Sequence, residues 1–360
     1  MKKFMRNRIS CFVGIAMMMA CTDNVVPEKM SVAAQLIPDE TIAVNSVFAL
    51  KRYGITDPED FIKQGNLFVV GRSYEDYQIR VIDTRRNESS GMLKFGEGVE
   101  ESIGITGLTL SSDGNVTALD YRKGKLHELP VSPLSRGGAA SELQLTPERV
   151  HLAAIKGESF VITTGLYDEG RYRYYSEESG EEHYYLPYPG HPDYPELSEK
   201  AKSMLYASTV LRLRPDEGAF VCTEMRSGIM DICRIADGKI ECICRRCFHY
   251  PKVRVIDKED EVDVAYYQDN VFGFQDVAVS NDRIYVLYSG KTYREAQQNV
   301  SQCQTLLVFD WEGNLLSSVR LDIPVYKISF DTVENMLYGL KGTYGDIELM
   351  RLNVWGAEGV

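Results

Sequence analysis

A group of cysteines comes closer to a metal site than any other pattern in the sequence. The run from Cys242 to His249 contains three cysteines and one histidine, and three thiolates with one imidazole can bind zinc at about 2.0–2.3 Å. The spacing is irregular, however, and in a strand Cys242 and Cys244 would lie about 6.6 Å apart on one face. We therefore expect buried thiols or disulfides in this run, and no bound metal.

Two other cysteines, Cys222 and Cys233, lie on segments that we expect to pair as neighbouring strands. Exported proteins meet an oxidising environment, in which such pairs form disulfides. The Cys222–Cys233 pair is therefore our first candidate for a disulfide bridge.

The segment from Leu166 to Tyr194 is the richest in residues suited to binding, because it contains eight tyrosines. Tyrosine offers an apolar ring with a hydroxyl at its edge, which suits contact with proteins and stacking on sugars. The candidate binding residues are Tyr167, Arg171, Tyr172, Arg173, Tyr174 and Tyr175. The alternative is that half of the tyrosines alternate into the core of the domain.

The sequence contains no recognisable catalytic motif. None of its five histidines has a familiar setting, and no Gly-x-Ser-x-Gly nucleophile elbow occurs. The stretch 111–117 (SSDGNVT) partly resembles the Asp-box of sialidases, but it lacks the aromatic residue and occurs once, so we interpret it as a hairpin turn. Enzymes with propeller folds draw acids and bases from separate blades, so spacing along the chain cannot exclude catalysis.

The first twenty residues predict export. Four basic residues in the first eight are followed by an uncharged, mostly apolar run, 9–20. That run would span about 18 Å as a helix, against a hydrocarbon core of about 30 Å, so it is typical of a removable signal peptide. It ends in MMAC, which resembles a lipobox with Cys21 as the acylated residue.

Charge excludes nucleic acid as a partner. The formal net charge is −12, and removal of the four basic residues within 1–20 takes it to −16. Proteins that bind nucleic acid need a clustered basic face. The densest basic pair, Arg245–Arg246, is instead surrounded by cysteines and aromatic residues.

Six repeats of a β-hairpin pattern predict the fold class. Each repeat runs from an apolar segment through a short polar turn into a second apolar segment, as β-hairpins do. The turns lie at 65–66, 113–115, 156–158, 216–218, 281–282 and 334–335. Third and fourth strands follow most of them, so the sequence predicts an all-β protein, a six-bladed β-propeller. A pair of β-sandwiches agrees less well with the six-fold recurrence.

The last repeat has too little chain for a fourth strand. The β-prone stretch 41–50 is the segment left to supply it, and we predict that this N-terminal strand pairs with the last blade and closes the ring. The expected organisation is a signal peptide at 1–20, a lipidated tether at 21–40 and the propeller at 41–360. Helix is expected to be minor, with one or two turns between Pro195 and Tyr206.

Three stretches of the C-terminal third carry a resemblance to a known family. Residues 283–295 (RIYVLYSGKTYRE), 305–322 (TLLVFDWEGNLLSSVRLD) and 328–340 (ISFDTVENMLYGL) resemble the final blades of TolB-like six-bladed propeller lipoproteins of Bacteroidota. The resemblance implies a six-bladed propeller but no transferable catalytic residues. TolB itself binds other envelope proteins, although this chain has no room for its additional N-terminal domain.

Together these features predict a lipoprotein of the outer membrane, facing the periplasm or the cell surface. We expect a monomer that binds or scaffolds a protein or glycan partner, with no cofactor and no catalysis. The alternative is a carbohydrate-active hydrolase or lyase with acidic residues in the propeller channel. Two close carboxylates or a bound divalent cation on the channel axis would favour the enzyme, and a channel plugged by apolar side chains would disfavour it.

Overall fold

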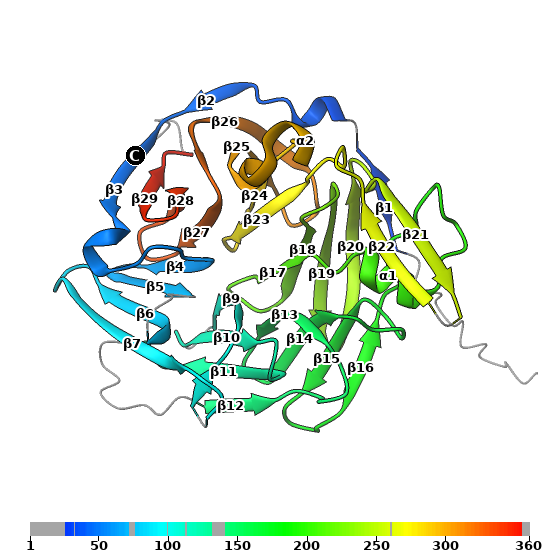
Figure 1. The fold of residues 1–360 in the computed structure, drawn as a ribbon, viewed down its shortest axis with the longest axis horizontal. Helices are drawn as coiled ribbons and strands as arrows, with labels where there is room; N and C mark the ends of the chain where they lie inside the picture. Colours follow the sequence, from blue (N-terminus) through cyan, green and yellow to red (C-terminus); the bar gives the residue numbers. More distant parts are fainter. Residues whose placement is uncertain are drawn as a thin grey trace, which may run out of the picture.

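Six β-sheets stand around a central axis in the computed structural model (Figure 1). The structure describes residues 26–31, 33–71, 76–98, 100–111, 114–131, 141–259 and 261–354. The four main strands of each sheet are antiparallel neighbours, as in a propeller blade. The predicted all-β fold, a six-bladed β-propeller, is confirmed.

The blades follow one another along the chain. Blade 1 contains β4 (Asp60–Gln64), β5 (Leu67–Gly71), β6 (Tyr77–Asp83), β7 (Glu88–Phe95) and β8 (Glu101–Ser102). Blade 2 contains β9 (Ile105–Leu110), β10 (Val116–Asp120), β11 (Lys125–Leu129) and β12 (Ser141–Gln144). Blade 3 contains β13 (His151–Lys156), β14 (Phe160–Gly165), β15 (Tyr172–Ser176) and β16 (Glu182–Tyr185).

The second half of the ring has the same order. Blade 4 contains β17 (Thr209–Leu213), β18 (Ala219–Glu224), β19 (Ile229–Ala236) and β20 (Lys239–Cys247). Blade 5 contains β23 (Phe274–Val279), β24 (Ile284–Tyr288), β25 (Cys303–Phe309) and β26 (Leu315–Val325). Blade 6 contains β27 (Lys327–Asp331), β28 (Met336–Thr343), β29 (Asp346–Leu352) and, from the N-terminal part of the chain, β3 (Val44–Ala49).

The six turns predicted from the sequence join the first and second strands of the six blades. Several need the left-handed backbone, with φ of 54° at Gly65, 59° at Glu217 and 51° at Asn335. Because the first strand of every blade is its inner strand, all six turns lie at one end of the ring. We call this end the turn face.

The apolar core is divided into layers between neighbouring blades. One layer joins Phe68 and Val70 of blade 1 to Leu340 of blade 6, and another joins Leu119 of blade 2 to Val161 of blade 3. A blade is therefore covered on both faces, which explains why every residue of β10 and β14 is buried. Strands in this position need continuous apolar runs rather than strict alternation.

Residues 26–49, which we call the N-terminal strap, run along the outside of three blades (Figure 1). Strand β1 (Glu28–Met30) pairs in parallel with β20 of blade 4, and β2 (Glu40–Ile42) pairs in parallel with β26 of blade 5. Strand β3 then pairs antiparallel with β29 of blade 6. The predicted closure of the ring by an N-terminal strand is therefore confirmed.

The boundary between tether and propeller differs from the expected one at residue 40. Strand β1 adds a fifth strand to blade 4, and strand β2 adds a fifth strand to blade 5. Leu36 is buried in the layer between these two blades. The Ser31 amide also donates to the Cys247 carbonyl at 2.9 Å. The reason is that each outer strand offers an unpaired ladder, which a passing polar segment can occupy through its backbone alone.

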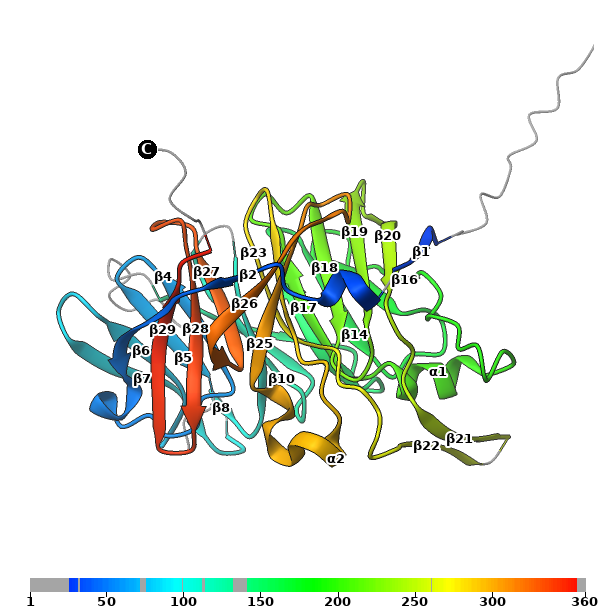
Figure 2. The ribbon, with the colours of Figure 1, turned by 90° about the horizontal axis from the view of Figure 1, so that it is seen from above.

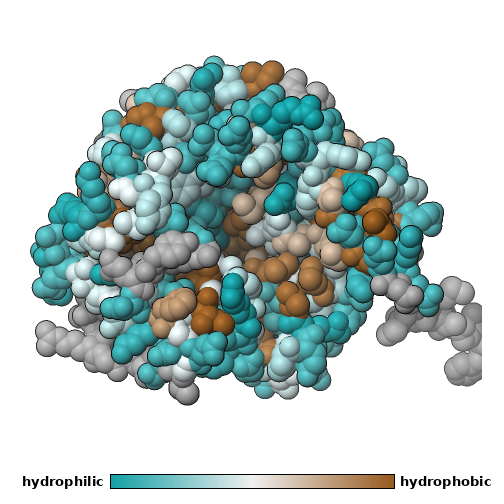
Figure 3. Space-filling view, in the orientation of Figure 1, coloured by the Kyte–Doolittle hydropathy of each residue, from teal (hydrophilic) through white to brown (hydrophobic). Residues whose placement is uncertain are grey.

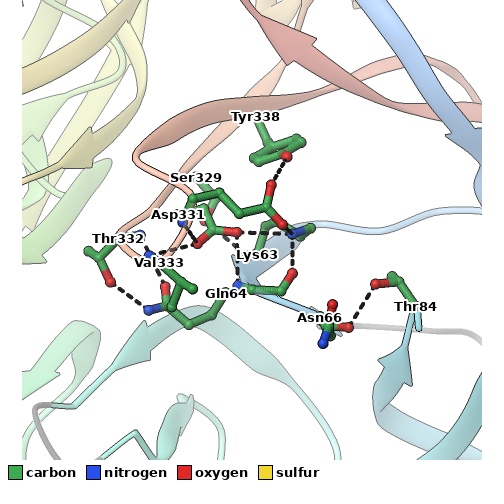
Figure 4. Close-up of polar contacts among 11 residues, drawn as sticks. Lys63, Gln64, Asn66, Thr84, Ser329, Asp331, Thr332, Val333 and Tyr338 are labelled. Carbon is green, nitrogen blue, oxygen red and sulfur yellow. Dashed lines mark hydrogen bonds and ion pairs between the residues drawn. The ribbon is translucent and has the colours of Figure 1, made fainter. Parts of the chain in front are cut away.

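A buried ion pair also joins the first and last blades (Figure 4). The Lys63 ammonium lies 2.9 Å from Asp331 Oδ2 and 3.0 Å from Glu334 Oε1. The side chains of Lys63 and Asp331 are 5% and 0% exposed. The Gly65 amide donates to the same Asp331 oxygen at 2.9 Å. The closure of the ring is thus both a strand pairing and an electrostatic contact.

Opposite the turn face, three small elements lie on one side of the ring (Figure 2). They are α1 (Glu199–Leu205), α2 (Tyr293–Ala296) and the hairpin of β21 (Val253–Lys258) with β22 (Glu261–Tyr266). Helix α1 lies within the predicted range, and the Ser198 side chain caps it by accepting from the Ala201 amide. Short 3₁₀ turns span Ala33–Leu36, Leu50–Tyr53 and Gln297–Ser301. Among the described residues, no helix has the length and apolarity to cross a bilayer.

Candidate functional site

The tyrosines and arginines predicted to bind a partner lie inside the protein. Rather than forming an insertion, this part of the chain supplies β15 and β16 of blade 3. The exposed fractions are 0% for Tyr167 and Tyr172, 7% for Tyr174, 1% for Arg171 and 2% for Arg173. Tyr175 is half-buried beside Arg173. The alternative of core packing therefore describes these residues better than a role in binding a partner.

The buried arginines belong to a charged network between blades 3 and 4. Asp231 accepts two hydrogen bonds from Arg245, at 2.7 and 2.9 Å, and one from the Tyr172 hydroxyl at 2.8 Å. Arg171 lies 3.4 Å from the same carboxylate and donates to Glu224 at 3.0 Å. None of these four charged side chains is more than 3% exposed. The network therefore serves to hold the two blades together.

The pKa values of the network show which charges it stabilises. Burial acts to raise the pKa of Asp231, but Arg245 and Arg171 outweigh it and lower this pKa to about 2. Burial raises the pKa of Glu224 well above its usual value, against the attraction of Arg171. Asp231 is therefore the firmly ionised centre of the network, and both arginines depend on it for neutralisation.

All six cysteines within the described residues are free thiols. The predicted Cys222–Cys233 bridge is not formed, because the register places Cys222 opposite Asp231 and Cys233 opposite Phe220. On its other side Cys233 faces Cys242. Within the part of the chain that the structure describes, no group of three or more His, Cys, Asp or Glu side chains is arranged to hold a metal ion.

We expect these thiols to differ sharply in reactivity. Burial raises the pKa of Cys222 and of Cys247 to about 11, whereas Cys242 is partly exposed. In a Cys21→Ser mature chain, maleimide at neutral pH should modify Cys242 first, and the two buried thiols only after unfolding. Peptide mapping by mass spectrometry would show this order, and early labelling of Cys222 would contradict it.

The candidate site is a pocket of about 430 Å³ in the central channel. Its walls come from blades 1, 2, 4, 5 and 6, and residues of three hairpin turns (Gly114, Glu217 and Thr332) lie at its rim, so it opens on the turn face. Figure 3 shows the opposite face, where the centre of the ring is also hollowed. The aliphatic residues of the walls are Ile62, Leu67, Val69, Leu108, Leu110, Val116, Val131, Leu213, Ala278, Val279 and Ile328.

Two carboxylates lie beside Arg212, an arginine that lines the pocket, and are bridged by it. Arg212 Nη2 is 3.3 Å from both oxygens of Asp60 and 3.4 Å from Asp276 Oδ1. The ammonium of Lys327 lies 3.6 Å from the same Asp276 oxygen. Burial raises the pKa of Asp276, and Lys327 and Arg212 oppose this rise. If all four side chains are ionised, the two positive charges of Arg212 and Lys327 balance the two negative charges of Asp60 and Asp276.

Backbone amides occupy most of the remaining acceptor positions of these carboxylates. Phe61 N–H donates to Asp60 Oδ1 at 2.9 Å, and Leu108 N–H donates to Asp60 Oδ2 at 2.7 Å. The Ile328 amide donates to Asp276 Oδ2 at 2.8 Å. Each oxygen thus has a donor already, which leaves little capacity for the proton transfers of a general acid and base. The arrangement joins the inner strands of five blades instead.

Most polar side chains around the pocket are bonded to one another. Gln64 and Thr332 share two hydrogen bonds across the boundary of blades 1 and 6 (Figure 4). Arg214 donates to Asp216 at 2.6 Å, and its guanidinium lies 5.2 Å from the centre of the Trp311 ring. Glu217 differs from these residues. Its Oε1 is buried and has no hydrogen-bond partner among the described residues.

None of the four charged residues around Arg212 was predicted from the sequence as part of a site. Asp60, Arg212, Asp276 and Lys327 come from four blades and are widely separated in the chain. A signal was present, since Arg212 and Asp276 are charges inside the otherwise apolar segments TVLRL and FQDVAV. A charge in a buried strand requires a partner, although the sequence cannot say which.

Comparison with known proteins supports this architecture. A putative exported protein of Bacteroides fragilis is 8% identical, and the match covers 92% of this chain and 100% of that one, with a TM-score of 0.57. A member of the duf4221 family from Bacteroides vulgatus is 9% identical, with 88% and 96% covered and a TM-score of 0.53. At such identities the likeness shows the fold alone.

No curated protein matches the chain. A family model described as TolB-like 6-blade propeller-like matches residues 85–333, which is more than half of the sequence. The match includes blades 2 to 5, the outer strands of blade 1 and the first strand of blade 6, and it agrees with the observed ring of sheets. The chain therefore belongs to the TolB-like six-bladed propeller family.

Proposed function

We propose that this protein is an exported envelope lipoprotein whose propeller binds a partner at the pocket of the turn face. The observation that carries the proposal is the pocket itself, because a concave site of 300–1,000 Å³ with mostly apolar walls is the usual form of a binding site. The signal sequence and Cys21 support export and lipidation, and the likeness to a putative exported protein of Bacteroides fragilis agrees with export.

The strap would determine how the domain sits on the membrane. Six residues lie between Cys21 and Glu28, where β1 begins, so a lipid on Cys21 would lie within about 25 Å of the outer edge of blade 4. Such a lipoprotein would be a binding domain held close to the outer membrane by a short tether. Its partner is another envelope component.

The carbohydrate-active alternative is not favoured by the geometry of the channel. Asp60 and Asp276 are two close carboxylates near the axis, which is the position an acid pair would need. Their oxygens are held by Arg212, Lys327 and backbone amides, however. A non-catalytic role agrees better with carboxylates whose acceptor sites are filled.

Photocrosslinking in cells tests the proposal. A photoreactive amino acid at Leu110 or Val279, both in the pocket wall, should give a discrete adduct. The same amino acid at Val47, which is 46% exposed on β3 and outside the pocket, should not give that adduct. A Val279→Phe substitution, which adds bulk to the pocket wall, should weaken the adduct formed from position 110. Equal adducts from all three positions, or none from the pocket, would overturn the proposed function.

A further inference from the structure

We propose that Cys233 and Cys242 are a site of disulfide formation, which crosslinks strands β19 and β20 of blade 4. The two thiols are free in the structure and lie opposite each other on these strands. The inference uses the export that belongs to the proposed function, because export places the chain in an oxidising compartment. It does not depend on the pocket.

The hairpin that contains both cysteines sets their alignment by itself. Asp237 and Gly238 form its two-residue turn, with φ of 51° and 70°, and a positive φ at both positions is typical of a type I′ turn. From the residues that flank this turn, the register continues without a shift to Cys233 opposite Cys242. The two thiols therefore meet as soon as the hairpin forms, before the ring closes.

The position of the pair within the ladder suits a disulfide. Opposite residues of an antiparallel pair alternate between hydrogen-bonded and non-hydrogen-bonded positions. The Ile235 amide donates away from β20, to the Gly218 carbonyl at 3.0 Å, so Ile235 and Cys233 both occupy non-hydrogen-bonded positions towards β20. The Cα atoms of such a pair are about 4.5 Å apart, within the range of about 4.4–6.8 Å that a disulfide spans.

Both side chains also lie on the same face of blade 4. Cys233 is buried in the apolar layer between blades 3 and 4, and Cys242 packs against that layer. Cys242 is partly exposed, whereas Cys233 is not. An oxidant can therefore reach Cys242, and Cys233 is the thiol placed to react next.

The neighbouring Cys244 does not compete for Cys242. Strand β20 has a bulge at Ile243, which shifts the register between Ile232 and Cys233. Cys244 consequently pairs with Ile232, and its thiol lies beside Gly313 of blade 5. Cys242 and Cys244 thus lie on opposite faces of the blade, unlike the two residues of a regular strand.

Cys222 does not compete for Cys233. It lies opposite Asp231 on β19, two residues from Cys233, and diagonal neighbours of this kind are about 7–8 Å apart. Cα atoms more than about 7 Å apart are not bridged unless the backbone moves. The Arg171 guanidinium also donates to the Cys222 sulfur at 3.5 Å.

The reaction is thiol–disulfide exchange with an oxidant that itself contains a disulfide. The Cys242 thiolate attacks one sulfur of the oxidant, and the other oxidant sulfur leaves as a thiolate. Cys233 then loses its proton and attacks the Cys242 sulfur of the mixed disulfide, which releases the second oxidant sulfur. The two cysteines lose two electrons and two protons, and the oxidant takes them up as two thiols.

The second step should be slow in the folded protein. Burial raises the pKa of Cys233 well above its usual value, and only the thiolate attacks. In the isolated hairpin this burial is absent. We therefore expect the crosslink to form faster during folding than after it.

Oxidation of the purified chain tests the site. The mature Cys21→Ser chain is prepared in the reduced state, unfolded, and refolded with oxidised glutathione. Trypsin should then release peptides 227–234 and 240–245 as one crosslinked species, lighter by two hydrogen atoms than the two peptides together. Maleimide should label Cys242 only after dithiothreitol is added. The oxidised protein should unfold at a temperature about 3–6 °C higher than the reduced one, because the crosslink restricts the unfolded chain.

Two matched variants identify the sulfur atoms, since peptide 240–245 contains two cysteines. Cys242→Ala should remove both the crosslinked species and the difference in unfolding temperature. Cys244→Ala should retain the crosslinked species, because its side chain faces blade 5. A crosslink that persists in Cys242→Ala, a bond from Cys233 to Cys222, or no crosslink after refolding would overturn the inference.

The outcomes are distinct from those of the proposed function. Refolding of the purified chain requires neither a partner nor an intact pocket, so a failure there concerns Cys233 and Cys242 alone. Absence of the adducts at positions 110 and 279 in cells would end the proposed function and leave the crosslink unaffected. In cells, trapping of thiols with acid should find the pair oxidised in the full-length chain and reduced in a chain without residues 1–20. A pair that is reduced in both would overturn the inference.

Discussion

Asp231→Asn is expected to lower the free energy of unfolding by about 3–5 kcal/mol, the usual cost of removing one partner from a buried ion network. The Asp231 carboxylate is fully buried and bonded to Arg245, with Arg171 3.4 Å away. Without its charge, two buried guanidinium groups would share Glu224 alone. Urea unfolding of both proteins measures the difference.

An exposed ion pair supplies the matched control. Asp269 lies 3.1 Å from Lys252, and both side chains are largely in water. Asp269→Asn should therefore leave the stability unchanged within error, because exposed pairs contribute little. Equal effects of the two substitutions would show that the buried network does not hold blades 3 and 4 together.

The effect of Asp231→Asn should also depend on pH. Arg245 and Arg171 lower the folded-state pKa of Asp231 to about 2, below the value in the unfolded chain. The stabilisation by Asp231 is therefore fully present above the unfolded pKa and is lost as the pH falls through the folded one. The difference in stability between the two proteins should narrow as the pH is lowered from about 5 towards about 2. A constant difference would contradict this assignment.

Removal of the strap up to residue 49 is expected to abolish the monomeric propeller. A chain that begins at Leu50 lacks β3, which pairs with β29 from Glu348 to Leu352. It also loses Val44 and Ile42 from the layer between blades 5 and 6. The last blade would then expose an unpaired edge, which favours association with other chains. Circular dichroism and size-exclusion chromatography should show unfolded or oligomeric protein.

A shorter deletion separates ring closure from the rest of the strap. A chain that begins at residue 39 keeps β2 and β3 and loses β1 and the buried side chain of Leu36. It should remain a folded monomer with a lower unfolding temperature. If the chain that begins at Leu50 were an equally stable monomer, β3 would not be needed to close the ring.

The number of blades and their closure were predictable because they depend on local patterns. Each hairpin turn carries a chemical signal, such as Gly65 or Asn335 in a left-handed conformation, between two apolar strands. Counting the strands of each repeat showed that the last one lacks its fourth strand, and residues 41–50 were the segment left to provide it. Helix α1 was also visible, since its apolar residues recur with helical spacing.

The candidate site could not be predicted in this way, because its residues meet only when the ring closes. Tyr172 and Arg171 look like surface binding groups in a polar, aromatic segment, yet burial against blade 4 turns them into part of the core. Conversely, Asp60 and Arg212 meet across the channel although 152 residues separate them.

The sequence by itself determined the repeating hairpins and the need for a borrowed strand, because hydrogen bonding and burial along neighbouring residues specify them. Only the tertiary structure decided which charges are buried in pairs, such as Asp231 with Arg245 and Asp60 with Arg212. Electrostatic pairing between blades depends on distances that no local pattern encodes.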